Sequence, residues 1–320
     1  MFALARLAMR SRGHAAVAAG AMAGIAYAMF AGTQVVLLVF LPVALLLYAS
    51  GAIVGLATLR NGPTEGALVA LGATAMLAVG IVLTGTRWLH MLEALLSVWV
   101  PALVTTAVLV RTASQGRALE ALALLAAAGW TLAFAFNGDL AVKLEPWVRE
   151  VWEQLETAMR QSGSAADMRV APVAPLELAR VFVQLLMSWW VLGAVLTLML
   201  ARSWHARMDR PGAFGEEFRE LRLPRSMALA LPVVLIVGAI ASDGLKTYAG
   251  GLAQLGLLLF AVQGVALAHA FVKMRNAHSA WLVGVYLLPF VVPMAILAIA
   301  FVGYLDHWLD YRRRASAMRD

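Results

Sequence analysis

The sequence predicts an all-α, polytopic integral membrane protein with about nine transmembrane helices and one amphipathic helix outside the membrane. Hydrophobic residues make up 62% of the chain and charged residues only 13%, whereas a soluble domain carries about 25% charged residues. The apolar residues form solid runs near the roughly 20 residues that cross a bilayer. Alternation typical of a membrane barrel is missing, and backbone groups in lipid must be bonded internally, so we expect helices.

The whole chain, residues 1–320, is expected to form a single transmembrane domain. Its predicted spans are residues 15–31, 34–58, 65–84, 88–110, 118–136, 176–201, 226–241, 248–272 and 281–305. A count of eight to ten stays open, because the 226–241 run is short. The first run resembles a signal peptide with an Ala26-Tyr27-Ala28 box, but we favour a retained helix since many spans follow.

Basic residues set the predicted orientation. The loops on the N-terminal side contain Arg6, Arg10, Arg12, Arg60, Arg111, Arg117, six arginines within 202–225, Lys273 and Arg275, whereas the opposite short loops contain Arg87 and Lys246. Because basic loops remain on the cytoplasmic side, we expect a bacterial inner-membrane protein with a cytoplasmic N-terminus. The basic tail, residues 306–320, conflicts with nine spans, which would place Arg312, Arg313 and Arg314 outside; the sequence leaves its side open.

The extracytoplasmic loop, residues 137–173, contains a predicted amphipathic helix over residues 144–163. Pro146 suits its first turn and Gly163 its end. Its apolar face would present Trp147, Val148, Val151, Trp152, Leu155 and Met159, with Glu145–Arg149 and Glu156–Arg160 as pairs on the other face. We expect the helix at the outer membrane surface, either as a lid on the bundle or as a docking face for a partner.

The cytoplasmic charged loop, residues 202–225, contains a second short helix. Phe214, Phe218 and Leu221 recur at helical spacing among charged residues, and Pro224 ends the segment before the next span. A helix with one solvent-exposed side and one apolar side accounts for the charges. The basic residues before this helix are suited to binding anionic lipid at the membrane surface.

Small residues recur four positions apart within the first two spans. Gly20, Gly24 and Ala28 do so in the first, and Gly51 and Gly55 in the second. Such spacing lets helix backbones approach closely. Packing inside one bundle is the favoured interpretation, and a homodimer is the alternative.

The best candidate for a binding site is the segment RWLHMLEALLSVW, residues 87–99. His90, Glu93 and Ser97 share one helix face, and Arg87 lies one turn before them. Ionisable groups inside spans are costly and therefore suggest function. Glu93 is expected about two turns into its span, where it pairs with Arg87 or His90 or faces water or a ligand. A buried ion pair that fixes helix register is the structural alternative.

Two later spans carry further polar side chains. They are Arg180, Gln184 and Ser188 in span 176–201, and Gln254, Gln263 and His269 in span 248–272. Glutamine inside a span commonly bonds a neighbouring helix, which is the favoured interpretation. Lining of a polar cavity is the alternative.

Signatures of enzymes and cofactor sites are missing from the sequence. The chain has no cysteine, which excludes disulfides, thiolate metal sites and cysteine nucleophiles. It has no HExxH, GxSxG or GxxxxGK[ST] motif, and two ligands on one helix do not make a zinc site. No basic stretch is interleaved with aromatic residues for nucleic acid. We therefore expect no enzyme, cofactor or metal, and any ATPase would be another chain.

Three segments of the C-terminal third carry a resemblance: FGEEFRELRLPR, AVQGVALAHAF and VGYLDHWLDYRRR. Their order resembles the YybS-like family of uncharacterised bacterial multi-pass membrane proteins, over residues 214–314. The matching positions are Phe218, Leu223, Pro224, Gln263, Gly264, Gly303, Asp306 and Arg312. Members look distantly similar to the substrate-capturing membrane subunits of energy-coupling-factor vitamin transporters. The resemblance implies a solute bound among the helices and ATPase partner subunits, and it implies no catalytic residues.

Two functional hypotheses follow from these patterns. The first is solute binding or transport, with His90, Glu93, Gln184 and Gln263 facing an internal cavity. The second is a non-transporting scaffold or assembly factor with an envelope-protein partner, acting through the Trp147–Met159 face and the 202–225 loop. A polar pocket that Glu93 and a glutamine from another span both reach would favour the first hypothesis.

Overall fold

The computed structural model is all-helical throughout the residues that it describes, namely 2–31, 36–85, 87–161 and 174–313. Seven helices among these residues are long and apolar enough to cross a membrane. Three shorter apolar helices, Arg225–Ile240, Ala280–Val291 and Ala295–Leu309, accompany them. The prediction of a polytopic helical membrane protein is therefore confirmed, and the first residues of the predicted span 34–58 lie outside the described ranges.

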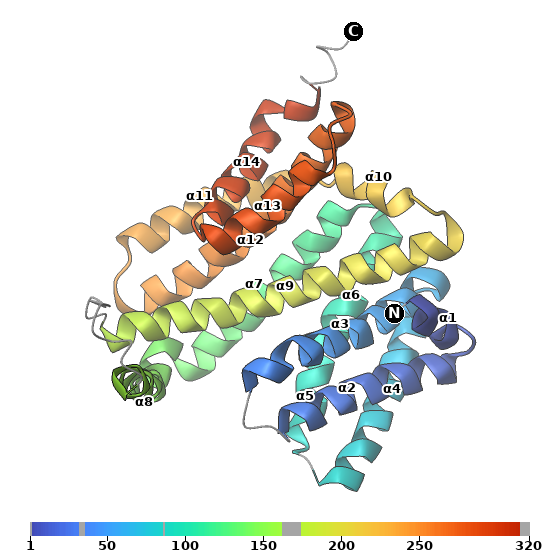
Figure 1. Ribbon diagram of the computed structural model, residues 1–320, viewed down its shortest axis with the longest axis horizontal. Coiled ribbons are helices and arrows are strands. Elements are labelled where there is room, and N and C mark those ends of the chain that lie inside the picture. Colours follow the sequence, from blue (N-terminus) through green and yellow to red (C-terminus); the bar gives the residue numbers. More distant parts are fainter. Residues whose placement is uncertain (1, 32–35, 86, 162–173, 314–320) are drawn as a thin grey trace.

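The helices divide into an N-terminal and a C-terminal group (Figure 1). The N-terminal group contains α1 (Phe2–Ala8), α2 (Arg12–Ala31), α3 (Val36–Asn61), α4 (Pro63–Thr84), α5 (Leu89–Ala94), the π-helical turn η1 (Leu95–Trp99) and α6 (Val100–Thr112). The C-terminal group contains α7 (Gln115–Asn137), α8 (Leu140–Gln161), α9 (Pro175–Asp209), α10 (Ala213–Arg219), α11 (Arg225–Ile240), α12 (Asp243–Met274), α13 (Ala280–Val291) and α14 (Ala295–Leu309).

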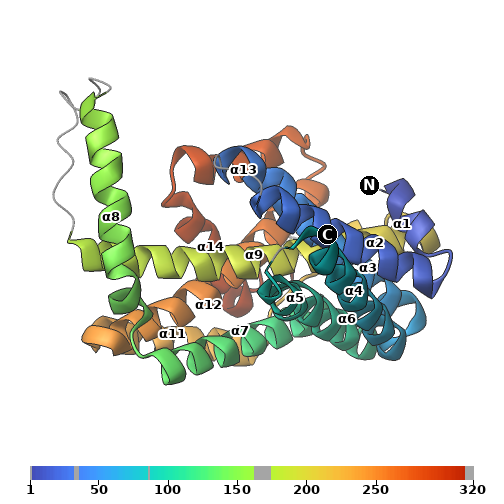
Figure 2. The ribbon, with the colours of Figure 1, turned by 90° about the horizontal axis from the view of Figure 1, so that it is seen from below.

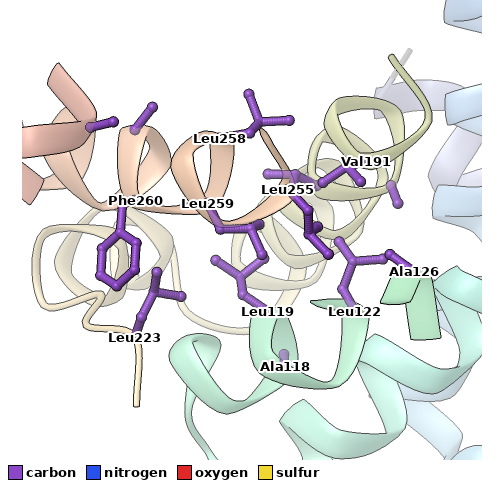
Figure 3. Close-up of a cluster of buried hydrophobic side chains, with 14 of the residues drawn as sticks. Ala118, Leu119, Leu122, Ala126, Val191, Leu223, Leu255, Leu258, Leu259 and Phe260 are labelled. Carbon is purple, nitrogen blue, oxygen red and sulfur yellow. The ribbon is translucent and has the colours of Figure 1, made fainter. Parts of the chain in front are cut away.

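Helix α9 connects the two groups. Its 35 residues make it about 52 Å long, and Figure 1 shows it crossing the molecule between them. Val191 and Leu198 belong to the C-terminal core, whereas Ala201 and Trp204 belong to the N-terminal core. In the C-terminal core, leucines of α12 lie against leucines of α7 (Figure 3).

The N-terminal core is built from small residues. A Cβ added at Gly20 would meet the carbonyl oxygen of Ala73 and the side chain of Met76 on α4, and one added at Gly51 would meet Val98 and Thr197. The spacing of small residues thus serves packing within one bundle, as the favoured interpretation predicts. Close backbone approach lets these helices gain dispersion contacts, which drive association in lipid.

The predicted span 281–305 is not one helix, and this prediction is corrected. The chain leaves α13 at Val292, whose backbone is extended with φ −127° and ψ 92°, because the following Pro293 excludes its helical conformation. Helix α13 has 12 residues, about 18 Å, too short for a hydrocarbon core of about 30 Å. Figure 1 shows α14 turning back from α13, so the pair forms a helical hairpin.

The hairpin returns the C-terminus to the end of the bundle where other basic segments gather. Arg60 lies 4.0 Å from Asp209 at this end, and the Arg312 guanidinium donates to the carbonyl oxygen of Leu221 at 2.9 Å. We call it the basic end; it contains residues 2–12, 60–63, 111–117, 202–225, 273–279 and 309–313. Nine continuous spans, which create the conflict for the basic tail, are therefore not observed in the described residues, and Arg314 lies outside them.

Helix α8 is the predicted amphipathic helix, and Figure 2 shows it lying across the ends of α7 and α9. It begins at Leu140, where the Asp139 carboxylate accepts a hydrogen bond from the Ala141 amide at 2.9 Å. Pro146 therefore lies inside the helix rather than in its first turn, which corrects the predicted start. The predicted end at Gly163 lies outside the described residues, as do the side chains of Met159 and Arg160.

The two faces of α8 have different surroundings. Val148 is buried against Ala179 of α9, while Trp147, Val151 and Leu155 are exposed. The predicted Glu145–Arg149 pair is confirmed. Position across the bundle end and an exposed apolar face are what a helix at a membrane surface requires.

The predicted helix of the charged loop is confirmed as α10. The rings of Phe214 and Phe218 stack at 6.0 Å between centroids, and Leu221 is buried. On the other side, Glu217 forms an ion pair with Arg202 near the end of α9. Helix α10 thus packs by its aromatic side, while Glu217 is held in a part-buried ion pair against α9.

Candidate functional site

A hollow of about 480 Å³ lies between α2, α3, the α5–η1 segment and α9. Six aromatic side chains stand in its wall: Tyr27, Phe30, Phe40, Tyr48, Trp189 and Trp190. The charged side chains of the wall, Arg87, His90 and Glu93, come from the start of one span. We call this hollow, with these nine residues, the aromatic cavity.

The predicted polar cluster faces the aromatic cavity. Nδ1 of His90 lies 2.8 Å from the Glu93 carboxylate. Of the two partners predicted for Glu93, Arg87 and His90, the structure therefore shows His90. The Tyr27 ring stacks on the His90 ring with centroids 4.6 Å apart. Arg87 and Ser97 line the same hollow. Tyr27 thus holds the imidazole from α2, while Glu93 holds it from its own helix.

Glu93 lies nearer the membrane surface than its position in the sequence suggests. Helix α5 begins at Leu89, so Glu93 is about one turn, or 6 Å, into the span rather than two turns. Its side chain is 55% exposed, against 15% for its partner His90. The pair is therefore open toward the hollow and is not the buried, register-fixing ion pair of the structural alternative.

A π-helical turn follows the polar cluster. It covers Leu95–Trp99, and such turns often occur at functional sites. The Trp99 indole donates to the Ser50 hydroxyl at 2.9 Å, and this hydroxyl donates to the Ala19 carbonyl at 2.8 Å. These two bonds link the irregular turn to α3 and α2, two helices that also line the aromatic cavity.

The two predicted glutamines do not line the aromatic cavity. Gln263 is fully buried; its amide nitrogen donates to the Gly303 carbonyl at 2.8 Å, and its amide oxygen accepts from the Leu223 amide at 2.8 Å. The Gln184 amide lies against Gly250 of α12. For Gln263 the structure shows the favoured interpretation, in which the amide forms hydrogen bonds to neighbouring segments.

A second polar cluster joins α12, α14 and the segment between α10 and α11 at the basic end. It contains Leu221, Arg222, Leu223, Gln263, Gly264, Gly303, Asp306, Asp310 and Arg312, and we call it the C-terminal junction. Helices α12 and α14 cross where Gly264 meets Gly303, and a Cβ on either glycine would overlap backbone atoms of the other helix. Most of the positions that carry the YybS-like resemblance therefore meet at one place.

Ion pairs close the C-terminal junction. Asp306 is fully buried, 3.4 Å from Nε of Arg312 and 3.8 Å from Nε of Arg222. Burial lowers the pKa of Arg312, and the Asp306 carboxylate opposes this effect. A hydrogen bond from Arg222 lowers the pKa of Asp310 below its ordinary value. Arginine remains protonated in proteins, so these charges hold the C-terminal helix on the 221–224 segment.

The lining of the aromatic cavity combines the features of a ligand pocket. Within the described ranges, no group of three or more histidine, aspartate or glutamate side chains is placed to hold a metal ion. Aromatic walls favour flat apolar groups or cations, and a few convergent polar groups fix orientation in ligand pockets. The cavity offers both elements in one wall.

The aromatic wall is the part of the site that sequence reasoning missed. Tyr27, Tyr48 and Trp190 come from three different helices. Each ring alone is ordinary in an apolar span, and the only local signal was the pair of tryptophans after Ser188. Their convergence depends on how the helices pack.

Comparison with known proteins gives one match. Residues 54–307 match the model of a family described as "Predicted membrane protein (DUF2232)". The matched segment includes the polar cluster of the aromatic cavity and most of the C-terminal junction. No curated protein and no solved structure matches the chain.

Proposed function

We propose, from the premise that this chain belongs to the DUF2232 family of predicted membrane proteins, that it binds a small organic solute in the aromatic cavity as a step of transport. The observation that carries the proposal is a hollow of about 480 Å³ whose wall combines six aromatic side chains with Arg87, His90 and Glu93. Ligand pockets typically measure about 300–1,000 Å³ and combine apolar walls with a few polar groups.

The wall chemistry favours a particular class of solute. The rings of Tyr48, Trp189 and Trp190 suit a flat apolar body. Arg87 and the His90–Glu93 pair offer donors and a carboxylate to a polar head group that both donates and accepts hydrogen bonds. A solute with a ring system and a polar or zwitterionic head meets both requirements.

We infer that the basic end is cytoplasmic and that the protein lies in a bacterial inner membrane. The support is the gathering of arginines at this end, including the returned tail, which follows the positive-inside rule. The polar end of the aromatic cavity would then face outward. Alkaline phosphatase fused after residue 320 should be inactive, and the same fusion after residue 138 active; the reverse pattern would overturn this orientation.

Partner subunits complete the proposal. The sequence contains no GxxxxGK[ST] nucleotide motif, so transport driven by ATP would need a separate ATPase, as the family resemblance implies. The basic end offers α10 and its flanking arginines for such a contact. Mild purification followed by mass spectrometry of co-purifying subunits tests this part of the proposal.

The central experiment compares Glu93→Gln with Glu177→Gln. Both glutamates pair with a basic side chain three residues away, and their side chains are 55% and 50% exposed, but Glu177 does not line the aromatic cavity. Small molecules that co-purify with the wild type are identified by mass spectrometry, and their affinities are then measured. Loss of a charge-assisted contact of about 1.5–3 kcal/mol weakens binding roughly 10- to 100-fold.

The expected result is weaker binding for Glu93→Gln alone, with an unchanged size-exclusion profile for both variants. Equal affinity of Glu93→Gln and wild type would refute the assignment of the site. A co-purified molecule that binds equally well when Ala44→Trp fills the hollow would refute it as well, since Ala44 stands in the wall.

The exposed face of α8 supports a second candidate function, the scaffold or assembly factor. Trp147, Val151 and Leu155 are apolar, adjacent on the helix and exposed. If this function holds, replacement of all three by serine removes an envelope-protein partner, whereas Glu93→Gln has no effect on the phenotype. The two substitutions therefore separate the two candidates.

A further inference from the structure

A second hollow, of about 460 Å³, lies among α9, α10, α12, α13 and α14. We call it the C-terminal chamber. Its lining is apolar, with Met199, Ala261, Val265 and Ile299 among its residues. Water in such a space finds too few hydrogen-bonding partners, and apolar cavities stay dry or take up apolar molecules. The chamber is therefore suited to hydrocarbon.

The C-terminal chamber opens toward the surroundings of the bundle. Leu196 and Phe290 belong to its lining, yet they are 46% and 85% exposed. Helix α13, which forms one wall, has no buried side chain. At the depth of the spans these surroundings are lipid, so an acyl chain can enter between α9 and α13 without crossing water.

One hydrogen-bonded pair interrupts the apolar lining. Nε2 of His269 lies 2.9 Å from the hydroxyl oxygen of Tyr286, which joins α12 to α13. The Phe218 ring meets the His269 ring edge-on at 5.4 Å between centroids. This pair lies on the side of the chamber nearer the basic end, where a lipid inserted from that leaflet would place its ester groups.

Basic side chains continue beyond this pair. Lys273 lies one turn, about 5.4 Å, beyond His269 along α12, and it is exposed, as is Arg275. Arg219 follows Phe218, which contacts His269. Cations just outside the apolar region attract anionic head groups, each contributing about one kcal/mol in free energy.

We propose that the C-terminal chamber holds one acyl chain of an anionic phospholipid. The ester region meets the His269–Tyr286 pair, and the phosphate lies among Arg219, Lys273 and Arg275. The occupant follows from three observations together: an apolar chamber open to lipid, one hydrogen-bonding pair at its rim, and positive charge immediately beyond the rim. This site is separate from the aromatic cavity and does not rest on the proposed transport function.

The test uses the full-length protein in phosphatidylcholine nanodiscs with trace lipids that carry a photoreactive diazirine in the acyl chain. One arm contains labelled phosphatidylglycerol, a second labelled phosphatidylcholine, and a third a labelled free fatty acid. After irradiation, mass spectrometry maps the modified residues. The expected result is modification of α12 between 258 and 269 and of α13, with phosphatidylglycerol preferred over phosphatidylcholine at least about fivefold.

Two kinds of variant sharpen the test. Val265→Trp and Ala261→Phe fill the C-terminal chamber and should each abolish this labelling, whereas Ala133→Trp places an even larger added side chain beside a different hollow and should leave it intact. Lys273→Gln with Arg275→Gln leaves the chamber unfilled and changes only exposed residues; it should remove the preference for phosphatidylglycerol.

Three outcomes would overturn the proposal. Unchanged labelling in a folded Val265→Trp or Ala261→Phe variant would show that no chain occupies the chamber. Equal labelling by both phospholipids would show that the site does not select an anionic head group. Labelling by the free fatty acid alone would identify a free amphiphile, and not a phospholipid, as the occupant.

Discussion

The aromatic cavity and the C-terminal junction use similar charged residues in opposite ways. In the junction, Asp306 is fully buried between two arginines. In the cavity, Glu93 is 55% exposed and its partner faces a hollow. Breaking a buried pair by removing one partner costs about 3–5 kcal/mol, whereas an exposed pair contributes about 0–1 kcal/mol. The junction should therefore govern stability, and the cavity should govern binding.

The packing of the C-terminal junction also explains why a glutamine and two glycines occur there. Gln263 satisfies the Leu223 amide and the Gly303 carbonyl at once, and Gly264 and Gly303 let the two helices touch. Both features pack α14, the returning helix of the α13–α14 hairpin, against α12 and the segment that precedes α11. The aromatic cavity does not require such close packing of helices, so its polar groups remain available to a ligand.

The largest expected effect comes from Asp306→Asn. The substitution leaves Arg312 buried without its carboxylate, and the free energy of unfolding should fall by about 3–5 kcal/mol. Asp310→Asn is the matched control, because Asp310 also pairs with Arg222 but its side chain is 38% exposed; it should change stability by less than about 1 kcal/mol. Denaturation in detergent measures both. Equal losses would remove the distinction between buried and exposed pairs within the junction.

A smaller effect is expected from Gly303→Ala. The added methyl group meets the backbone of Phe260 and Gly264, and overpacking of this kind costs about 1–3 kcal/mol. Gly284→Ala serves as the control, because nothing lies within 4 Å of a Cβ at that position. The same denaturation assay compares them. A neutral Gly303→Ala would mean that the helices do not cross through this glycine.

The sequence predicted the helices well because lipid leaves few alternatives. A long apolar run must be helical, and charge marks its ends, so most spans and both short polar-faced helices could be read directly. The exception is the run 281–305, where length and hydropathy suggested one span. Pro293 was the available signal, since a residue before proline avoids the helical conformation; Pro289 lies inside α13 and does not end it.

The site was predicted only in part, for a physical reason. Charge inside a span is rare enough to single out His90 and Glu93. The role of a glutamine cannot be predicted in this way, because its amide is chemically suited both to bonding a neighbouring helix and to lining a cavity. Only the packing of α12 against α14 assigns Gln263 to the first role, and only the packing of three helices gathers the aromatic wall.

The comparison predicts little change in stability for Glu93→Gln. The pair is open to the hollow, so the loss should stay within about 1 kcal/mol, while binding weakens as argued above. His90→Gln should change the stability by a similar amount, and any further loss of stability would come from the stacking contact with Tyr27. Thermal unfolding without ligand measures the effect. A loss as large as that of Asp306→Asn would show that the cavity pair is structural.

The smallest expected effect concerns pH and the tail. Arg222 lowers the pKa of Asp310 in the folded protein, so the pair contributes stability that is present above the unfolded pKa of about 3.9 and is lost as pH falls through the lower folded value. Trp308 lies near Arg225, which is 5.9 Å from its ring, so its fluorescence reports the packing of this segment. Below about pH 4 the wild type should lose this packing toward the level of Asp310→Asn. The two proteins should therefore differ at pH 7 and converge in acid; a difference that grows as pH falls would contradict the role of Asp310 in holding the tail.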